Sequence, residues 1–384
     1  ELITDVLNGF EAKEYSIGVF LDLSKAFDTI DHSMLLKKLE FYGIRGLALS
    51  WFGNYLKDRQ QYVDFKGCNS EQLKLRCGVP QGSVLGPLLF IIYTNDLKDV
   101  LNPSKPILFA DDTTISYKHS DIYTLINIVN VDLEKACDWF RANKLSVNAS
   151  KTHFMIFHSR FLKLPEGNFT LKMDGVILER TDNVKFLGLY IDDKLEWHYH
   201  ISHIKSKLSQ ALYILNATKR YLPLTALKTL YYSLIYSHLN YGIVHWCNTY
   251  DYNLVKLRTL QNDALRAITK SKPKTTPHAL YKKTNILYFS DVSKMETLKL
   301  VYGFVNKSLP QPLMTIFKFN ESIHNYNTRQ SNDPHHDPYK YNIVFESFLH
   351  KGPELWSTIP PDVKNFKSKK GFAKKVKKIF LSEY

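Results

Sequence analysis

Two aspartates stand side by side in the segment Phe109-Ala110-Asp111-Asp112, between apolar runs at residues 107–108 and 113–117. This pattern predicts a strand, a tight turn and a second strand, with two carboxylates at the turn. Adjacent ionised carboxylates repel each other, so a fold keeps them together only where a cation or a proton offsets the repulsion. An ordinary polar hairpin tip is the plainer interpretation of an isolated Asp-Asp pair.

A third carboxylate, Asp22, follows another apolar strand at residues 17–21. If the two strands are neighbours in one sheet, three carboxylates meet at one sheet edge. Three carboxylates in that arrangement are the ligand set of a two-metal phosphoryl-transfer site, in which cations roughly 3.5–4 Å apart hold the attacking and leaving oxygens.

Two further segments could bind a nucleotide. Small Ala26 and bulky Phe27 follow Asp22, and Phe27 can either pack in the core or stack beneath a sugar and exclude its 2′-hydroxyl. The turn Gly78-Val-Pro-Gln81-Gly82 permits close backbone approach, and the helix after it offers N-terminal amides to phosphate. Read alone, it is also only a glycine-rich turn before a helix.

Two weaker signals come later in the chain. Lys151, in the segment Asn148-Ala-Ser-Lys-Thr, stands just before a strand and could approach a leaving pyrophosphate, although lone lysines are usually solvated. Gly188, in Phe186-Leu187-Gly188, sits within an expected strand over residues 184–191. Such a glycine often marks a bulge or the close passage of another backbone.

In this order, the motifs F-L-D-L-S-K-A-F-D, G-V-P-Q-G-S-V-L-G-P, F-A-D-D, N-A-S-K-T and F-L-G closely resemble the reverse transcriptase domain of non-LTR (LINE-type) retrotransposons. The resemblance runs from about residue 1 to residue 195. It implies a right-hand polymerase palm that transfers nucleotides from dNTPs to a primer 3′-hydroxyl.

The resemblance also implies roles for individual residues. Asp22, Asp111, Asp112 and the backbone carbonyl of Leu23 would hold two Mg²⁺ ions, with Mn²⁺ as an alternative. The nucleotide would contact Lys25, Ala26, Phe27, Gln81, Gly82 and Lys151. Primer and template would contact Arg59, Gln61, Phe186, Leu187 and Gly188.

The elements that must position these residues alternate between strand and helix. Period-2 and helical patterns predict strands over residues 15–22, 151–157, 169–173 and 184–191, and helices over 2–12, 121–143, 198–220, 224–238, 253–269 and from about 366. The expected fold is α+β, a mixed-sheet palm followed by a helical thumb and a mainly helical C-terminal region. The expected domains are 1–195 (palm with partial fingers), 196–270 (thumb) and 271–384 (basic C-terminal region).

Composition supports a folded protein with a polyanionic partner. The 384 residues are 44% apolar and 14% aromatic, which is ample for a buried core and suggests two or three domains. The net charge of +14 is uneven, because residues 1–150 carry −3 and residues 151–384 carry +17. Such an imbalance suits nucleic acid. Four cysteines without C-x-x-C spacing predict neither a zinc site nor a disulfide framework.

Several expectations concern the whole molecule. The expected partners are an RNA template, a DNA primer and dNTPs, with no membrane and an intracellular location, nuclear or cytoplasmic. The family's fingers hairpin and endonuclease are expected upstream of Asp22 and are missing from this sequence, which predicts primer extension near background. The alternatives are a catalytically impaired remnant that only binds nucleic acid and, ranked last, a two-metal nuclease.

Two other clusters have plainer interpretations. His198, His200 and His203 do not share one helix face, so surface or packed histidines are expected rather than a metal site. Residues 369–380 combine an apolar stripe with six lysines. A docked terminal helix is expected there, with a nucleic-acid-binding or membrane-surface tail as the alternative. The segment 323–329 resembles the C-terminal region of some elements.

Overall fold

The computed structural model describes residues 1–101, 104–272, 275–323 and 331–384. Its contacts divide the chain into two compact units. We call residues 13–182 the sheet unit, and residues 1–12 with 183–384 the helical unit. The predicted segment 323–329 falls almost wholly outside the described residues. The predicted assignment of palm, thumb and C-terminal region, with boundaries after residues 195 and 270, stays a prediction.

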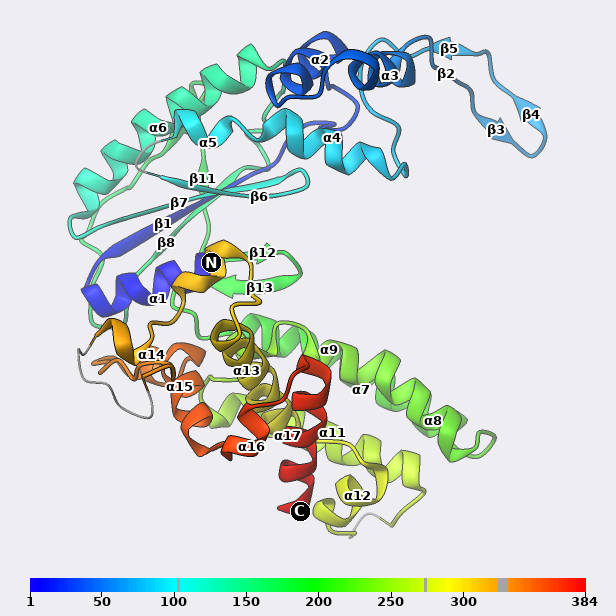
Figure 1. Cartoon of the computed structure of the whole chain (residues 1–384), viewed down its shortest axis with the longest axis vertical. Coiled ribbons are helices and arrows are strands. Elements are labelled where there is room, and N and C mark those ends of the chain that lie inside the picture. Colours follow the sequence, from blue (N-terminus) through cyan, green and yellow to red (C-terminus); the bar gives the residue numbers. More distant parts are fainter. Residues whose placement is uncertain (102–103, 273–274, 324–330) are drawn as a thin grey trace. The chain divides into compact units, whose positions relative to one another are not determined.

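The sheet unit is built on one mixed five-stranded sheet with the strand order β11-β8-β1-β7-β6 (Figure 1). All pairs are antiparallel except β11 with β8. The strands are β1 (Tyr15–Leu21), β6 (Lys105–Phe109), β7 (Asp112–His119), β8 (His153–Phe157) and β11 (Glu179–Arg180). β1 is the central strand, paired with β7 along one edge and with β8 along the other.

Helices cover one face of this sheet, as Figure 1 shows. They are α2 (His32–Phe41), α3 (Gly46–Leu56), α4 (Leu85–Thr94), α5 (Leu97–Val100) and α6 (Ile122–Ala142). The odd-numbered residues of β1, from Tyr15 to Leu21, join the same buried core as Leu125, Val129 and Leu133 of α6. Alternate residues of the strand and residues at helical spacing on α6 thus pack together in one apolar layer.

Short ladders extend from the sheet. Strands β2 (Gln60–Gln61) and β5 (Leu73–Lys74) pair with each other, and β3 (Asp64–Phe65) pairs with β4 (Cys68–Asn69) around Gly67. The strand predicted over residues 169–173 is only β9 (Lys172–Met173), which pairs with β10 (Val176–Ile177). The pattern overestimated it because its apolar residues pack on the core without a ladder partner.

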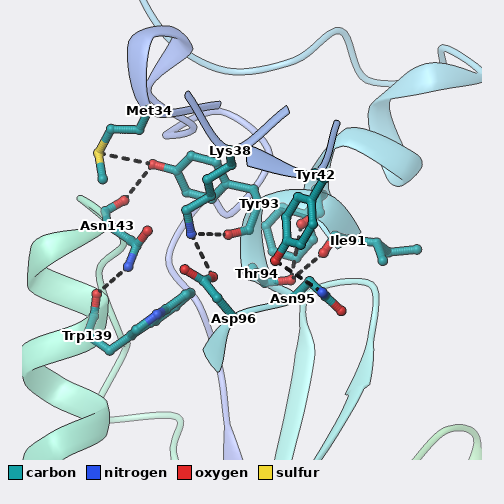
Figure 2. Close-up of polar contacts among 11 residues, drawn as sticks. Met34, Lys38, Tyr42, Ile91, Tyr93, Thr94, Asn95, Asp96, Trp139 and Asn143 are labelled. Atoms are coloured by element: carbon teal, nitrogen blue, oxygen red, sulfur yellow. Dashed lines mark hydrogen bonds and ion pairs between the residues drawn. The ribbon is translucent and has the colours of Figure 1, made fainter. Parts of the chain in front are cut away.

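A buried lysine joins α2, α4 and α6 (Figure 2). The Lys38 ammonium donates to Asp96 at 2.7 Å and to the Tyr93 carbonyl at 2.6 Å. It also lies 4.9 Å from the ring centroids of Tyr93 and Trp139. Burial lowers the pKa of Lys38, and the Asp96 carboxylate opposes that shift. The Tyr93 hydroxyl donates to the Asn143 carbonyl at 2.7 Å, which completes the connection to the end of α6.

The helical unit contains one hairpin and many helices. The hairpin is β12 (Asn183–Phe186) with β13 (Leu189–Asp192). The helices are α1 (Leu2–Ala12), α7 (His198–Thr218), α8 (Leu224–Tyr231), a π-helical turn (Tyr232–Tyr236), α9 (Ser237–Asn240), α10 (Ile243–Trp246), α11 (Asp251–Thr269), α12 (Pro277–Thr284), α13 (Phe289–Val305), two 3₁₀ turns (Gln311–Thr315 and Asn320–Ser322), α14 (Asn342–Phe345), α15 (Phe348–Thr358), α16 (Pro361–Lys364) and α17 (Lys369–Ser382).

These elements confirm the predicted fold class, an α+β fold with a mixed sheet followed by a helical region. None of the helices in the described parts of the chain is long and apolar enough to cross a membrane.

Of the three clustered histidines, His200 is packed in the interior. Only 4% of its surface is exposed, and its ring meets Trp197 and Trp246 edge to face at 6.2 and 5.9 Å. Its Nδ1 accepts the Tyr190 N–H at 3.4 Å. Burial lowers the pKa of His200 from 6.5 to about 4. His245, buried against Phe348, has its pKa lowered to about 4 in the same way.

These histidines make the helical unit less stable in acid. Between pH 6.5 and about 4, His200 binds a proton in the unfolded chain but stays neutral in the folded protein. The free energy of unfolding is therefore highest above pH 6.5 and falls as the pH drops through this window. The loss is about 3 kcal/mol for His200. We expect His200→Phe to flatten the pH dependence of urea unfolding measured by tryptophan fluorescence. The exposed His198→Gln should leave it unchanged, and an equal slope in both variants would contradict the assignment.

Candidate active site

The pairing of β1 with β7 positions two of the three predicted carboxylates. The last residue pair is Leu21 with Thr113, so the same register places Asp22, one residue further, opposite Asp112. Residues opposite each other in an antiparallel pair have Cβ atoms about 4.5–5.5 Å apart. Asp111 precedes Asp112 in the two-residue turn between β6 and β7, where Ala110 has a φ of 52°. The structure therefore brings all three aspartates to one end of the β1–β7 pair.

The three carboxylates influence one another. Partial burial raises the pKa of Asp112, and the charges of Asp111 and Asp22 raise it further. Like charges at this spacing destabilise the ionised state unless a cation or a proton is bound. The site is therefore electrostatically prepared for positive charge.

The backbone adds a fourth oxygen. The Asp22 carbonyl accepts the Asn148 N–H, and the Ser24 N–H donates to the Ser146 carbonyl, both at 2.8 Å. These bonds flank the bridge between Leu23 and Val147. In such a pair the polar groups of the central residue point away from the partner strand. The Leu23 carbonyl is thus directed toward the side on which β1 pairs with β7.

This donor set fits Mg²⁺, which prefers carboxylate and carbonyl oxygens. The side chains as they stand do not form a closed ligand cluster: within the described residues, no group of three or more His, Cys, Asp or Glu is arranged to hold a metal ion. The β1–β7 register sets Asp22 opposite Asp112, and a shared cation would require their side chains to turn toward each other. Their roles as catalytic residues and metal ligands stay predictions.

A cavity of about 390 Å³ lies beside these carboxylates. Seven sequence-predicted residues line it: Leu23, Lys25, Ala26, Phe27, Gln81, Gly82 and Asp111. The half-buried Phe27 ring rests on Phe90, with 4.8 Å between the ring centroids. Phe90 in the core therefore supports the Phe27 ring. The ring lines the cavity, where it can limit the size of a bound ligand.

The glycine-rich turn is attached to the segment after Asp22. The Gly78 N–H donates to the Ile30 carbonyl at 2.7 Å, and the Val79 N–H donates to the Phe27 carbonyl at 2.8 Å. Gln81 donates through Nε2 to the Asp28 carboxylate at 2.9 Å. Asp31, three residues further, caps α2 by accepting the Met34 N–H at 3.0 Å. The pairing of Asp28 with Gln81 joins residues 53 apart, and no local pattern predicts it.

Three predicted contact residues lie away from the cavity lining. Lys151 is exposed in the turn before β8, with its N–H bonded to the Asn148 carbonyl. The Arg59 guanidinium rests 5.3 Å from the Tyr55 ring centroid, and Gln61 is exposed in β2. Their predicted contacts with triphosphate and template stay predictions.

The predicted strand over residues 184–191 is a hairpin, so that expectation was wrong. Leu187 and Gly188 form its turn with φ of 45° and 82°, the positive values of a type I′ turn. The Tyr241 hydroxyl donates to the Leu187 carbonyl at 2.5 Å, and a Cβ on Gly188 would meet the Tyr241 ring at 3.2 Å. Tyr241 thus fixes the turn, which the sequence did not reveal. A primer contact by Phe186, Leu187 and Gly188 stays a prediction.

A larger cavity, of about 620 Å³, lies within the helical unit. None of the predicted site residues lines it. Four of its charged residues form ion pairs, Arg258 with Asp251 at 2.9 Å and Lys351 with Glu346. The smaller cavity beside the aspartates is therefore the candidate active site.

Comparison with known proteins shows which family the chain resembles. Residues 3–191 match the family described as reverse transcriptase (RNA-dependent DNA polymerase). The chain is 30% identical over 285 residues to a probable RNA-directed DNA polymerase from transposon BS of Drosophila melanogaster. It is 28% identical over 283 residues to the RNA-directed DNA polymerase from mobile element jockey of the same species. Each match covers 70% of this chain and 30% of the relative, so the chain spans about a third of the length of these proteins.

Among solved structures, the chain is similar to telomerase from Candida albicans in complex with a fragment of telomeric RNA. The identity is 14% and the TM-score 0.35, over 76% of this chain and 53% of that one, which is too weak to argue from.

Gly78 is the residue of the turn that should tolerate substitution least. Its φ is 86°, and an added Cβ would lie 2.8 Å from the Asp28 carbonyl oxygen. Gly67 has a similar φ of 83° but nothing within 4 Å. We expect Gly67→Ala to cost about 1 kcal/mol from backbone strain alone, and Gly78→Ala about 2–4 kcal/mol from strain plus overpacking. Urea unfolding measures both; equal losses would show that the contact with Asp28 is not limiting.

Proposed function

Since this chain belongs to the reverse transcriptase family of non-LTR retrotransposons through residues 3–191, we propose that it catalyses RNA-directed DNA synthesis at the end of the β1–β7 pair. The observation that carries the proposal is the register that sets Asp22 opposite Asp112, beside a cavity lined by Phe27 and Gln81. The substrates would be dNTPs, a DNA primer and an RNA template. An intracellular location, nuclear or cytoplasmic, is part of the same proposal.

In the proposed reaction the primer 3′-hydroxyl attacks the α-phosphate of a dNTP and pyrophosphate leaves. Asp22, Asp111, Asp112 and the Leu23 carbonyl would hold two Mg²⁺ ions. Such ions neutralise the phosphates and stabilise the attacking and leaving oxygens. Mn²⁺ would suit the same oxygen ligands.

The protein's own groups would orient the nucleotide. Lys25, Ala26 and Gly82 line the cavity with little side-chain bulk at the latter two positions, so a sugar and a triphosphate can approach the backbone. The Asp28 carboxylate holds the Gln81 amide at 2.9 Å, which limits the positions that Gln81 can take toward a base or sugar. Phe27, supported by Phe90, would lie beneath the sugar.

The carboxylates give the first test. We expect Asp22→Asn, Asp111→Asn and Asp112→Asn each to lower single-turnover primer extension on a homopolymer RNA template by about 10²–10³ or more, because transition-state charge would lose its counter-charge. The exposed Asp99→Asn lies outside the cavity lining and should retain the parental rate. If any of the three site variants retained the parental rate, that aspartate would not be a catalytic residue.

Failure of the parental chain to extend a primer with either Mg²⁺ or Mn²⁺ would leave nucleic-acid binding as its function. That result would correspond to the catalytically impaired alternative and to the near-background extension that the missing fingers predict.

Phe27 gives the second test. Replacing its ring by a smaller side chain should open space for a 2′-hydroxyl, so we expect Phe27→Val to reduce the preference for dNTP over rNTP by about 10–100-fold. The ratio of kcat/KM values for the two nucleotides measures it. Phe161→Val, at an exposed position, is the matched control. Unchanged sugar discrimination in Phe27→Val would remove the gate assignment.

A further inference from the structure

The last helix, α17, carries a charged surface that the matched family region does not include. Its apolar residues Phe372, Val376 and Phe380 are buried. Lysines lie on the rest of the helix surface: the exposed Lys370, Lys374 and Lys378 follow at four-residue spacing, about 6 Å apart along the axis, with the exposed Lys375 and the half-buried Lys377 beside them. We call these five residues the α17 lysine face.

The helix is attached firmly to the body of the helical unit. Phe372 stacks on Tyr302 of α13 with ring centroids 4.6 Å apart, and the Tyr302 hydroxyl donates to the Phe366 carbonyl at 2.6 Å. Beyond the other end of α17, the Tyr384 hydroxyl donates to Asp291 at 2.6 Å. Because both ends are fixed, the lysines project from a rigid helix.

Folding alone does not account for these lysines. Like charges four residues apart each cost about 0.2–0.5 kcal/mol, and cations in the first turn of a helix oppose its dipole. Among the ion pairs recorded for the described residues, none connects the α17 lysine face to a carboxylate. The charge therefore remains uncompensated in the protein by itself.

A lysine on α8 acts electrostatically on one member of this face. Burial and the neighbouring ammonium of Lys228, on α8, lower the pKa of Lys377. Two half-buried ammonium groups near each other form a local concentration of positive charge that an anion would relieve. Lys228 therefore adds to the positive charge around Lys377.

We propose that the α17 lysine face, extended by Lys228, binds the phosphate backbone of nucleic acid. A row of cations along about 12 Å of helix matches a polyanion with one phosphate every 3.4 Å per strand. Backbone contacts read no sequence, so the face would hold the template–primer without selecting it. A membrane surface is the poorer partner, because the apolar side of α17 is occupied by α13 and α15.

The choice of nucleic acid as partner rests on the proposed function, and the test separates the two. Binding of a short labelled RNA–DNA hybrid, and of single-stranded RNA, is measured by fluorescence anisotropy from about 50 to 200 mM salt. For the triple variant Lys370→Gln, Lys374→Gln, Lys378→Gln we expect affinity to fall about tenfold or more. The slope of log K against log salt should become shallower by about 2–3.

Two controls complete the experiment. Removing three exposed lysines of the sheet unit (Lys98→Gln, Lys163→Gln, Lys172→Gln) matches the change in net charge and should leave the slope nearly unchanged. Arginines at 370, 374 and 378 should preserve binding. Equal losses of affinity in the two glutamine variants, or parental affinity in the α17 variant, would overturn the inference. Binding to phosphatidylserine vesicles is measured alongside, and a loss by the α17 variant that is confined to these vesicles would also overturn it.

Catalysis is read separately. Absent primer extension by the parental chain, together with intact α17-dependent binding, would refute only the polymerase proposal.

Discussion

The antiparallel register between β1 and β7 is the constraint on which the rest of the site depends. Burial fixes that register: residues at odd positions of β1 enter the core beneath α6, and a slip of one residue would turn them to the opposite face. The same register sets Asp22 opposite Asp112 just past the last paired residues. The burial of apolar residues on one face of the sheet thus determines where the carboxylates of the candidate active site lie.

Much of this arrangement follows from local sequence patterns. The strands at Tyr15–Leu21 and His153–Phe157, the long helices α6, α7 and α11, and the three aspartates lie where alternation, helical spacing and turn signals predict them. Local patterns failed at Leu187 and Gly188, because a leucine at positive φ gives no turn signal. They also could not reveal contacts made across long stretches of chain, such as Tyr241 with Leu187.

Both units concentrate like charges that folding alone does not favour. In the sheet unit, partial burial and the charges of Asp111 and Asp22 raise the pKa of Asp112. In the helical unit, burial and the charge of Lys228 lower the pKa of Lys377. One cluster is negative and the other positive, but the same argument applies to both. Each cluster lowers the stability of the protein alone, and a bound ligand of opposite charge would raise that stability. Lys38 shows the contrast: its buried charge is matched by Asp96 within the protein.

The double pairing of β1 has a consequence for how the chain can change in length. Deleting or inserting one residue between Tyr15 and Asp22 would disturb the ladders to β7 and β8 at once, and would move Asp22 away from Asp112. The short ladders at residues 60–74 are exposed and pair only with each other, so added or lost residues there would disturb two-residue ladders alone. Insertions and deletions among related sequences should therefore occur mainly within residues 60–74. The number of residues from the start of β1 to Asp22 should stay the same.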